Sequence, residues 1–509
     1  MANEGIVYLV GAGPGDPGLL TLRGKECLEL ADVVVYDQLA NREFLAWAEK
    51  ATEKIYVGKH AGQHTMNQED INALLVRKAR EGKVVVRLKG GDPYVFGRGG
   101  EEAMELYQAG MRFEVVCGVT SGIAAPAYAG IPVTHRDCNT VMSFITGHED
   151  PLKPESTIDW ESLARGGGTL AFYMGVGNLS GIVENLVRYG RKPETPVALI
   201  RHGTLPTQEV VEGTLATIVE RVRAVGLKPP AITLVGDVVG LRASLRWFDQ
   251  RPLFGKTVVV TRSRTQSSDV ARQLQDLGAQ VLLFPTINIE PPQDDQPLRQ
   301  AVAALSSFDW VLFTSVNTVD SVFAALDALG GDARRFGASR VAAIGSATLE
   351  RLRVKGLRPD LVPSRFTSEA LLAALRDAGQ ITGRKFFMPR ADIAPPFLPD
   401  ALRAAGAEVT EATAYRTVPA APDEDVLNVL RNGGADVVTF TSSSTAANYA
   451  AIVRQALGDL PGNVLYASIG PETSSGASRE GLQIGLEATE STIPGLVAAL
   501  VRHFEGNKT

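Results

Sequence analysis

A glycine- and proline-rich loop near the start of the chain constrains the fold more than any other segment. Residues 10–21 read VGAGPGDPGLLT and follow the short apolar run 6–10. Glycines let a backbone turn sharply and come close to a ligand. The pattern therefore predicts a strand, a tight ligand-binding loop and then a helix that starts near Thr21, as in an α/β domain.

Two classes of ligand could bind to this loop, a dinucleotide or a ligand without phosphates. The spacing of Gly13, Gly15 and Gly18 fits the G-x-G-x-x-G pattern of dinucleotide-binding folds. Asp37 ends the second apolar run, where a ribose-binding carboxylate would stand. The two prolines of the loop, however, remove backbone N–H groups that would cradle a pyrophosphate. They favour a ligand without phosphates, and a nicotinamide-dependent oxidoreductase built on residues 1–130 is the alternative.

Length and composition exclude several classes of protein. A chain of 509 residues is long enough for roughly two to four domains. The net charge of −6 provides no basic surface for nucleic acid, and no apolar run approaches the ~20 residues that span a bilayer. Cys27, Cys117 and Cys138 cannot build a disulfide framework and indicate a reducing compartment. No signal peptide is visible, so a cytoplasmic enzyme is expected.

Strand-like and helix-like segments alternate through the first half. Residues 83–88 and 113–116 are expected to be strands, and 100–109 a helix whose acidic first turn suits the helix dipole. After His135 the alternation restarts, with apolar runs at 141–146, 169–173, 197–200 and 231–235. The restart predicts two α/β subdomains, at about 1–136 and 137–245. A cleft between them is the expected ligand site.

A second half begins after residues 246–254, which have little periodicity and are expected to be a linker. A new strand pattern opens at 256–262. Within this half, 309–319 and 436–446 look like an internal repeat, because each contains a strand, a Ser/Thr-rich turn and a helix. Two similar α/β lobes that face each other across a cleft are expected.

Residues 1–245 resemble the tetrapyrrole methyltransferases, and in particular their uroporphyrinogen-III C-methyltransferases. The motifs that carry the resemblance stand in one order: the loop at 10–21, VVYDQL at 34–39, VGK at 57–59, RLKGGDPYVFGRG at 87–99, GVTS at 118–121, GIPVTHR at 130–136 and YMG at 173–175. The resemblance implies two methylations of uroporphyrinogen III by S-adenosyl-L-methionine. The products would be precorrin-2, on the branch to sirohaem and cobalamin, and S-adenosyl-L-homocysteine. It also suggests a homodimer through this half.

The resemblance also implies a set of site residues. Asp37 would stabilise the charge on the methylated macrocycle or accept its proton, and Lys59 would donate a proton or pair with a substrate carboxylate. Residues expected to bind the cofactor are Pro14, Gly90, Gly91, Asp92, Val95, Thr120, Ser121, Met174 and Gly203. Residues expected to bind the carboxylates of the substrate are Arg87, Arg98 and Arg136.

Each assignment has a plainer alternative. Asp37 could cap a helix, and Lys59 could be a solvated surface lysine. The arginines could form ion pairs within the protein, the glycines could serve turn geometry, and Met174 could be core. The family usually has an arginine after the lysine, where this chain has His60. No metal site is expected: His60 and His64 are four residues apart, but no helix pattern supports one face, and the other histidines are scattered.

Residues 255–509 resemble uroporphyrinogen-III synthase. The motifs are VVTR at 259–262, FTSVN at 313–317, IGSAT at 344–348, PSRFTSE at 363–369, AYR at 414–416, TSSST at 441–445 and IGPET at 469–473. Their position directly after a methyltransferase that consumes the synthase's product supports the resemblance. It implies one lobe of about 255–286 plus 417–509 and an inserted lobe of about 287–416.

The implied reaction is the cyclisation of hydroxymethylbilane with inversion of its last ring, and it needs no cofactor. Tyr415 is the expected proton donor, or else a packing tyrosine. Residues expected to bind the substrate are Thr314, Ser315, Ser346, Thr441, Ser442 and Ser443. Helix N-capping is the alternative for these hydroxyls. The alternative for the whole half is a non-catalytic module that binds a tetrapyrrole.

Overall fold

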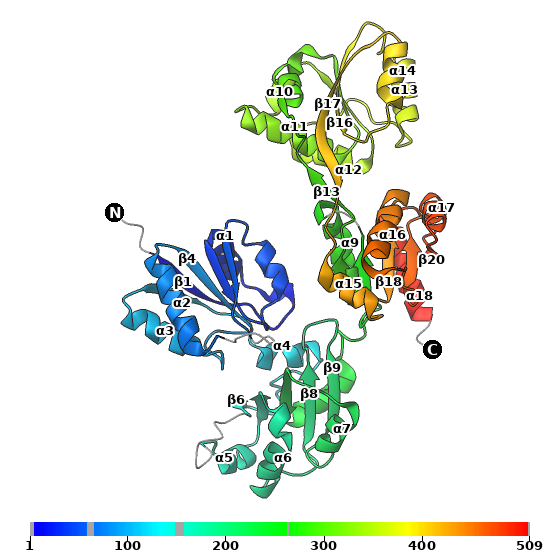
Figure 1. Cartoon of the computed structure of the whole chain (residues 1–509). Coiled ribbons are helices and arrows are strands. Elements are labelled where there is room, and N and C mark those ends of the chain that lie inside the picture. The colour runs from blue at the N-terminus through cyan, green and yellow to red at the C-terminus, as the bar shows by residue number, and fades with distance from the viewer. Residues whose placement is uncertain (1–4, 59–65, 148–156, 262–263, 507–509) are drawn as a thin grey trace. The chain divides into compact units, whose positions relative to one another are not determined.

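The structure is a computed structural model that describes residues 5–58, 66–147, 157–261 and 264–506 (Figure 1). Within these residues the chain forms four five-stranded sheets with helices packed against them, so the predicted α/β class is confirmed. Its contacts define two compact units. One contains residues 1–257, 273–281 and 501–509, and the other contains residues 258–272 and 282–500.

The first sheet is parallel and has the strand order β3-β2-β4-β1-β5. Its strands are β1 (Ile6–Gly11), β2 (Val33–Tyr36), β3 (Glu53–Tyr56), β4 (Val84–Lys89) and β5 (Arg112–Val116). The helices are α1 (Leu22–Leu30), α2 (Gln68–Arg80), α3 (Gly99–Gln108) and α4 (Ser121–Tyr128). Alternate residues of β1 belong to two separate core clusters, so this sheet is buried on both faces. That burial explains the continuous apolar runs in the sequence.

The second sheet is mixed, with the order β6-β7-β10-β8-β9. Its strands are β6 (Met142–Thr146), β7 (Thr169–Tyr173), β8 (Pro196–Arg201), β9 (Glu209–Thr214) and β10 (Ala231–Val235). The helices are α5 (Trp160–Arg165), α6 (Leu179–Arg188), α7 (Ile218–Val225) and α8 (Arg242–Leu245). Strand β10 runs antiparallel to both of its neighbours. The predicted restart of the pattern after His135 therefore corresponds to a second sheet.

The predicted linker is packed rather than free. Residues 246–254 contain no helix or strand, but the side chains of Phe248 and Leu253 are buried. The indole nitrogen of Trp247 donates to the carbonyl oxygen of Ala127 at 3.0 Å. The backbone N–H of Leu253 donates to the carbonyl oxygen of Leu277 at 2.9 Å. The segment lacks periodicity because it is held by aromatic packing and single hydrogen bonds.

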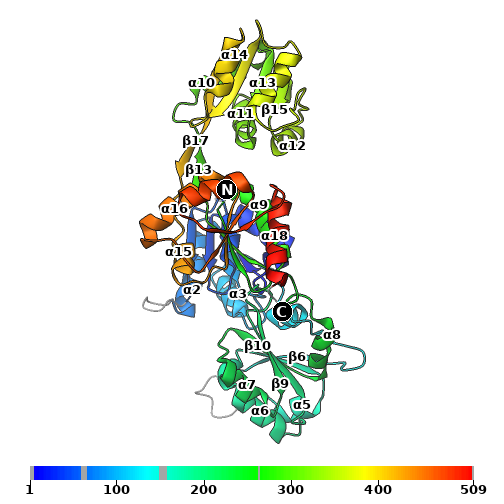
Figure 2. The same cartoon turned by 90° about the vertical axis from the view of Figure 1, so that its right-hand side faces the viewer.

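Two further sheets form the second half. The sheet β12-β11-β18-β19-β20 is built from β11 (Thr257–Val260), β12 (Gln280–Leu283), β18 (Val437–Phe440), β19 (Leu465–Ser468) and β20 (Ile484–Glu487). The sheet β13-β17-β16-β14-β15 is built from β13 (Ile287–Glu290), β14 (Trp310–Phe313), β15 (Arg340–Ala343), β16 (Lys385–Ala391) and β17 (Glu408–Pro419). Strands β13 and β17 form an antiparallel pair that both views show (Figures 1 and 2).

The helices of this half are α9 (Arg264–Asp276), α10 (Gln296–Ala303), α11 (Val316–Ala328), α12 (Ser346–Val354), α13 (Ser368–Asp377), α14 (Phe397–Ala404), α15 (Glu424–Arg431), α16 (Ser443–Leu457), α17 (Pro471–Arg479) and α18 (Ile493–Gly506). The two segments of the predicted repeat have the same local structure: β14 leads through Ser315 into α11, and β18 leads through Ser442 into α16. The domain and lobe boundaries drawn from the sequence stay predictions.

Candidate active sites

The glycine loop after β1 is paired with the loop after β4. The N–H of Gly13 donates to the carbonyl oxygen of Gly91 at 3.1 Å, and the N–H of Gly91 donates to that of Gly13 at 2.7 Å. Both glycines have left-handed backbone, with φ of 73° and 68°. Among the residues that the structure describes, a Cβ on Gly91 would meet only the Cα of Thr120, at 4.0 Å, so Gly91 is open on this side within them. A Cβ on Gly118 would lie 2.2 Å from the Gly91 oxygen, so Gly118 is required for packing.

Asp92 joins the loops that follow β4 and β5. One carboxylate oxygen accepts from the N–H of Tyr94 at 2.8 Å and the other from the N–H of Gly118 at 3.0 Å. Both interactions shape the rim of the predicted cofactor site from within the protein. Gly90 is equally tight, because a Cβ there would lie 2.5 Å from the Cβ of Leu39.

Tyr173, at the end of β7, connects the two subdomains. Its hydroxyl lies 2.6 Å from the Oγ1 of Thr120 and accepts from the N–H of Gly122 at 2.8 Å. Burial raises the pKa of this phenol, so it stays protonated. Thr120 and Ser121 stand at the N-terminus of α4. Sequence reasoning did not assign Tyr173 a role, although it lies in the YMG motif.

Several non-glycine residues with left-handed backbone follow the strands of these two sheets. They are Phe96, Arg98, Met174, His202 and Thr204, with φ between 48° and 76°. Such strain is uncommon and concentrates at functional sites. Met174 combines it with a side chain that is 54% exposed, which favours the predicted contact with a ligand over core packing.

Gly203 lies between two of these strained residues. Its Cβ would fall 2.3 Å from the Cβ of Ala125 in α4, so the residue lets the turn after β8 approach that helix closely. Two further predicted cofactor residues, Pro14 and Val95, are half-buried. Their contact with a cofactor stays a prediction, as it does for the other residues of the set.

A polar link that sequence reasoning missed ties the glycine loop to the second subdomain. The N–H of Asp16 donates to the Oγ1 of Thr204 at 3.1 Å, and one carboxylate oxygen of Asp16 accepts from the hydroxyl of Tyr128 at 2.6 Å. Gln208 donates to the backbone oxygen of Tyr128 at 3.3 Å. Burial and the neighbouring Asp16 raise the pKa of Tyr128. These contacts join residues far apart in the sequence.

Asp37 is held in a buried ionic network. Its Oδ2 lies 3.1 Å from the Nη2 of Arg87, and its Oδ1 accepts from the N–H of Leu39 at 3.1 Å. The Nε of Arg87 and the Nζ of Lys89 both contact Oε1 of Glu102, at 3.1 and 2.8 Å. Burial, together with the charge of Arg87, lowers the pKa of Lys89. The Asp37 side chain is 26% exposed, while the other three are buried. Asp37 thus presents the accessible part of the network.

The predicted substrate arginines differ in their surroundings. Arg87 contacts protein carboxylates, and Arg98 forms an exposed ion pair with Glu101 at 2.6 Å. Both arginines therefore form ion pairs within the protein, which is the plainer alternative to substrate binding. Arg136 is exposed. Substrate binding by these arginines stays a prediction, and Lys59 lies outside the described residues.

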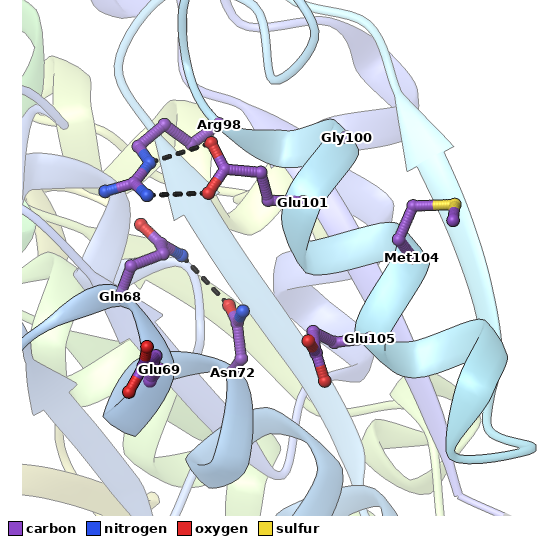
Figure 3. A pocket seen from close by; sticks show the side chains of 8 residues that line it. All are labelled: Gln68, Glu69, Asn72, Arg98, Gly100, Glu101, Met104 and Glu105. Carbon is purple, nitrogen blue, oxygen red and sulfur yellow. Dashed lines mark hydrogen bonds and ion pairs between the residues drawn. The ribbon is translucent and has the colours of Figure 1, made fainter. Parts of the chain in front are cut away.

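A surface hollow of about 490 Å³ lies beside this network, between α2 and α3 (Figure 3). It is lined by Gln68, Glu69, Asn72, Arg98, Gly100, Glu101, Met104 and Glu105. Gln68 also donates to Oε1 of Glu102 at 3.2 Å. The predicted cofactor residues are not part of this lining, so the hollow is distinct from the predicted cofactor site.

In the second half, Tyr415 of β17 places its hydroxyl 3.3 Å from the Oγ of Ser315. Ser315 also caps α11 by accepting from the N–H of Thr318 at 3.2 Å. Ser442 likewise caps α16, and Ser443 donates to the backbone oxygen of Glu472 at 2.9 Å. The N-capping alternative thus holds for Ser315 and Ser442.

The remaining hydroxyls also stand at junctions between a strand and a helix. Thr314 precedes the cap of α11, Ser346 is the first residue of α12, and Thr441 precedes the cap of α16. A role for any of these hydroxyls in substrate binding stays a prediction.

Among residues 5–58, 66–147, 157–261 and 264–506, no group of three or more His, Cys, Asp or Glu side chains could hold a metal ion. His60 and His64 lie outside these ranges. No helix in the described part of the chain has the length and apolar character to cross a membrane.

Comparison with known proteins identifies each half. Residues 6–219 match the family model described as Tetrapyrrole (Corrin/Porphyrin) Methylases, and residues 268–498 match that of Uroporphyrinogen-III synthase HemD. The porphyrin biosynthesis protein HemD of Ruminiclostridium josui is 36% identical over 99% of both chains.

Two other relatives are similar to the first half alone. The S-adenosyl-L-methionine-dependent uroporphyrinogen III methyltransferase of Methanosarcina barkeri is 57% identical over 47% of this chain and 94% of its own. A solved structure of uroporphyrin-III C-methyl transferase from Thermus thermophilus, complexed with S-adenyl homocysteine, is 42% identical. It covers 46% of this chain and 99% of that one, with a TM-score of 0.40.

Two α/β halves that match these two families define a bifunctional enzyme of tetrapyrrole biosynthesis. The chain belongs to the family in which a tetrapyrrole methylase is joined to a uroporphyrinogen-III synthase. Both resemblances found in the sequence are confirmed. The match of the first half decides against the nicotinamide-dependent alternative.

Proposed function

We propose that the second half cyclises hydroxymethylbilane to uroporphyrinogen III and that the first half methylates this product twice. S-adenosyl-L-methionine would be the methyl donor, and precorrin-2 and S-adenosyl-L-homocysteine the products. The cofactor assignment rests on one observation, the hydrogen bonding of the backbone N–H groups in the glycine loop. The N–H groups of Gly13, Asp16 and Gly18 all donate within the protein, and two prolines in the loop have none. Such a loop offers few N–H groups to a pyrophosphate and suits a cofactor without phosphates.

The chemistry follows from a nucleophilic carbon and a good leaving group. When bound, S-adenosyl-L-methionine would supply a sulfonium methyl group to an electron-rich pyrrole carbon, with S-adenosyl-L-homocysteine as the leaving group that takes the C–S electron pair. The macrocycle then carries a positive charge until it loses a proton. Asp37 supports this step as a fixed, partly accessible carboxylate that can stabilise the charge or accept the proton. The rest of the site orients two reactants and excludes water.

The cofactor would lie against the open side of Gly91, between the loops that Asp92 joins. Thr120, the residue before α4, borders that space, and the exposed Met174, directly after β7, is the proposed contact from the second subdomain. The carboxylates of a uroporphyrinogen require cations at the rim, and Arg98 and Arg136 are exposed candidates.

In the synthase half, Tyr415 is the proposed acid for departure of the hydroxyl of the bilane. Its phenol lies next to the hydroxyl of Ser315 at the N-terminus of α11. Backbone N–H groups at the starts of α11 and α16 would bind substrate carboxylates. The competing function for this half is tetrapyrrole binding without catalysis.

Replacing Tyr415 with phenylalanine is expected to slow cyclisation about ten-fold, because the leaving hydroxyl loses its proton donor. The measurement is the rate of uroporphyrinogen III formation from hydroxymethylbilane, with the ratio of the I and III isomers. Ser315→Ala is the matched control for loss of the neighbouring hydroxyl. A Tyr415→Phe enzyme with the full rate would remove Tyr415 from the mechanism.

The two activities are expected to separate when the chain is divided after residue 250. The fragment 1–250 keeps the packing of Phe248 on Tyr128, and the fragment 251–509 keeps Leu253 with its bond to Leu277. Each fragment is long enough to bury a core of its own. The first should methylate uroporphyrinogen III, and the second should cyclise the bilane without cofactor.

Circular dichroism and the two assays, run on each fragment alone, test this prediction. If 251–509 folds but the bilane closes spontaneously to the I isomer, the half is a binding module rather than a synthase.

The oligomeric state and the cellular location complete the proposal. A homodimer through the methyltransferase half is implied by the family resemblance, and sedimentation of the intact chain against fragment 251–509 would test it. Action in the cytoplasm agrees with three cysteines that form no disulfide.

A further inference from the structure

We infer that Glu102, a residue outside the predicted site, is a positioning residue that holds Asp37 in place for methyl transfer through Arg87. The inference rests on the proposed role of Asp37. It starts from an ionic network that stability alone does not explain.

The surroundings of Glu102 are unusual for a carboxylate. Its side chain is fully buried, and its Oε1 is contacted by three donors: Nε of Arg87 at 3.1 Å, Nζ of Lys89 at 2.8 Å and Nε2 of Gln68 at 3.2 Å. Its Oε2 is also buried, and has no hydrogen-bond partner among the described residues. Burying a charge with one oxygen unpaired costs free energy, so the network is a poor stabilising device.

Arg87 transmits the position of Glu102 to Asp37. Its planar guanidinium uses Nε for Glu102, Nη1 for the backbone oxygen of Leu88 at 3.1 Å and Nη2 for Asp37 at 3.1 Å. The arginine side chain is only 4% exposed, so it cannot turn toward solvent. Because the guanidinium is rigid and planar, the contacts of Nε and Nη1 also fix the position of Nη2.

Asp37 is therefore held at both oxygens. Arg87 contacts Oδ2, and the N–H of Leu39 contacts Oδ1. Without Glu102, the Nε of Arg87 loses its carboxylate, and among these contacts only that with the backbone oxygen of Leu88 still orients the guanidinium against Asp37. A displacement of about 1 Å at a reacting group can cost on the order of 100-fold in rate. The structure thus assigns Glu102 a role in catalysis without any contact to substrate.

The experiment compares Glu102→Gln with Glu105→Gln, an exposed glutamate on the same helix. Both are made in the full-length chain, and turnover is measured with uroporphyrinogen III and S-adenosyl-L-methionine. Glu102→Gln should lower kcat about ten-fold with S-adenosyl-L-homocysteine affinity and KM within two-fold. Glu105→Gln should leave all three unchanged.

A double-mutant cycle of Glu102→Gln and Asp37→Asn separates a positioning role of Glu102 from a purely structural one. If Glu102 acts through Asp37, adding Glu102→Gln to Asp37→Asn should cost no more than a further two-fold in kcat. If the loss of kcat in the double variant equals the product of the losses in the two single variants, the inference is overturned. A normal kcat in Glu102→Gln also overturns it. If Asp37→Asn alone has normal turnover, the proposed role of Asp37 is what fails.

Glu102→Gln leaves two buried cations beside one anion, and it could prevent folding for that reason. The variant Glu102→Gln/Lys89→Met removes one cation with the anion and keeps the cluster neutral. It should fold and show the same ten-fold loss of kcat. Full turnover in this folded double variant would also overturn the inference.

Discussion

An Asp37→Ala enzyme is expected to methylate uroporphyrinogen III about 100-fold more slowly than the parent, a loss of ~2.7 kcal/mol at the transition state. The carboxylate is fixed by Arg87 and Leu39 at a strand end, and it is the partly exposed member of an otherwise buried network. Charge that develops on the macrocycle would lose its counter-charge in the variant. Binding of S-adenosyl-L-homocysteine should change less than two-fold.

Single-turnover kinetics with calorimetric titration of S-adenosyl-L-homocysteine would check both parts of this expectation. Asp37→Asn is the matched comparison, since it keeps the size of the side chain and the contact with Arg87 but removes the charge. The two variants should be similarly slow if the charge matters. Normal turnover in Asp37→Ala would show that the network is structural.

The local elements of the fold could be predicted because they depend on neighbours in sequence. Continuous apolar runs predicted β1 and β7 close to their observed bounds, since strands buried on both faces of a sheet need apolar side chains on both faces. Helix N-capping, the alternative to substrate binding for the serines that follow β14 and β18, is observed for Ser315 and Ser442. These features require no knowledge of what packs against the segment.

Contacts across the fold could not be predicted in the same way. Asp16 and Thr204 are 188 residues apart, and no periodicity reports that they meet. Tyr173 likewise acquires its role only because α4 begins beside the end of β7. A single sequence describes local conformation well, but the pairing of polar groups depends on how the subdomains dock.

The burial of Glu102 could have been predicted from helical spacing. Two glutamates stand in the first turn of α3, and both look like acids that favour the helix dipole. The apolar residues Ala103 and Leu106 define the inward face of the helix, and Glu102 precedes Leu106 by one turn. Helical spacing therefore places Glu102 inside and Glu101 outside, and a buried carboxylate is a candidate for function.

A Gly91→Val enzyme is expected to fold but to lose at least ten-fold in affinity for S-adenosyl-L-homocysteine. Gly91 has φ of 68°, and a Cβ there would meet only the Cα of Thr120, at 4.0 Å, among the described residues. Valine would therefore strain the backbone by roughly 1–2 kcal/mol without a clash inside the protein. Its two methyl groups would instead occupy the open space where the cofactor is proposed to lie.

Gly110→Val is the control that separates strain from obstruction. Gly110 has φ of 71° and stands in the turn after α3, and no atom of the described residues lies within 4 Å of its Cβ position. Thermal unfolding should show a similar loss of stability in both variants, because the backbone penalty is the same. Calorimetry should show normal affinity in Gly110→Val and weak binding in Gly91→Val. Equal affinities in the two variants would mean that the loop at Gly91 is structural and that the cofactor binds elsewhere.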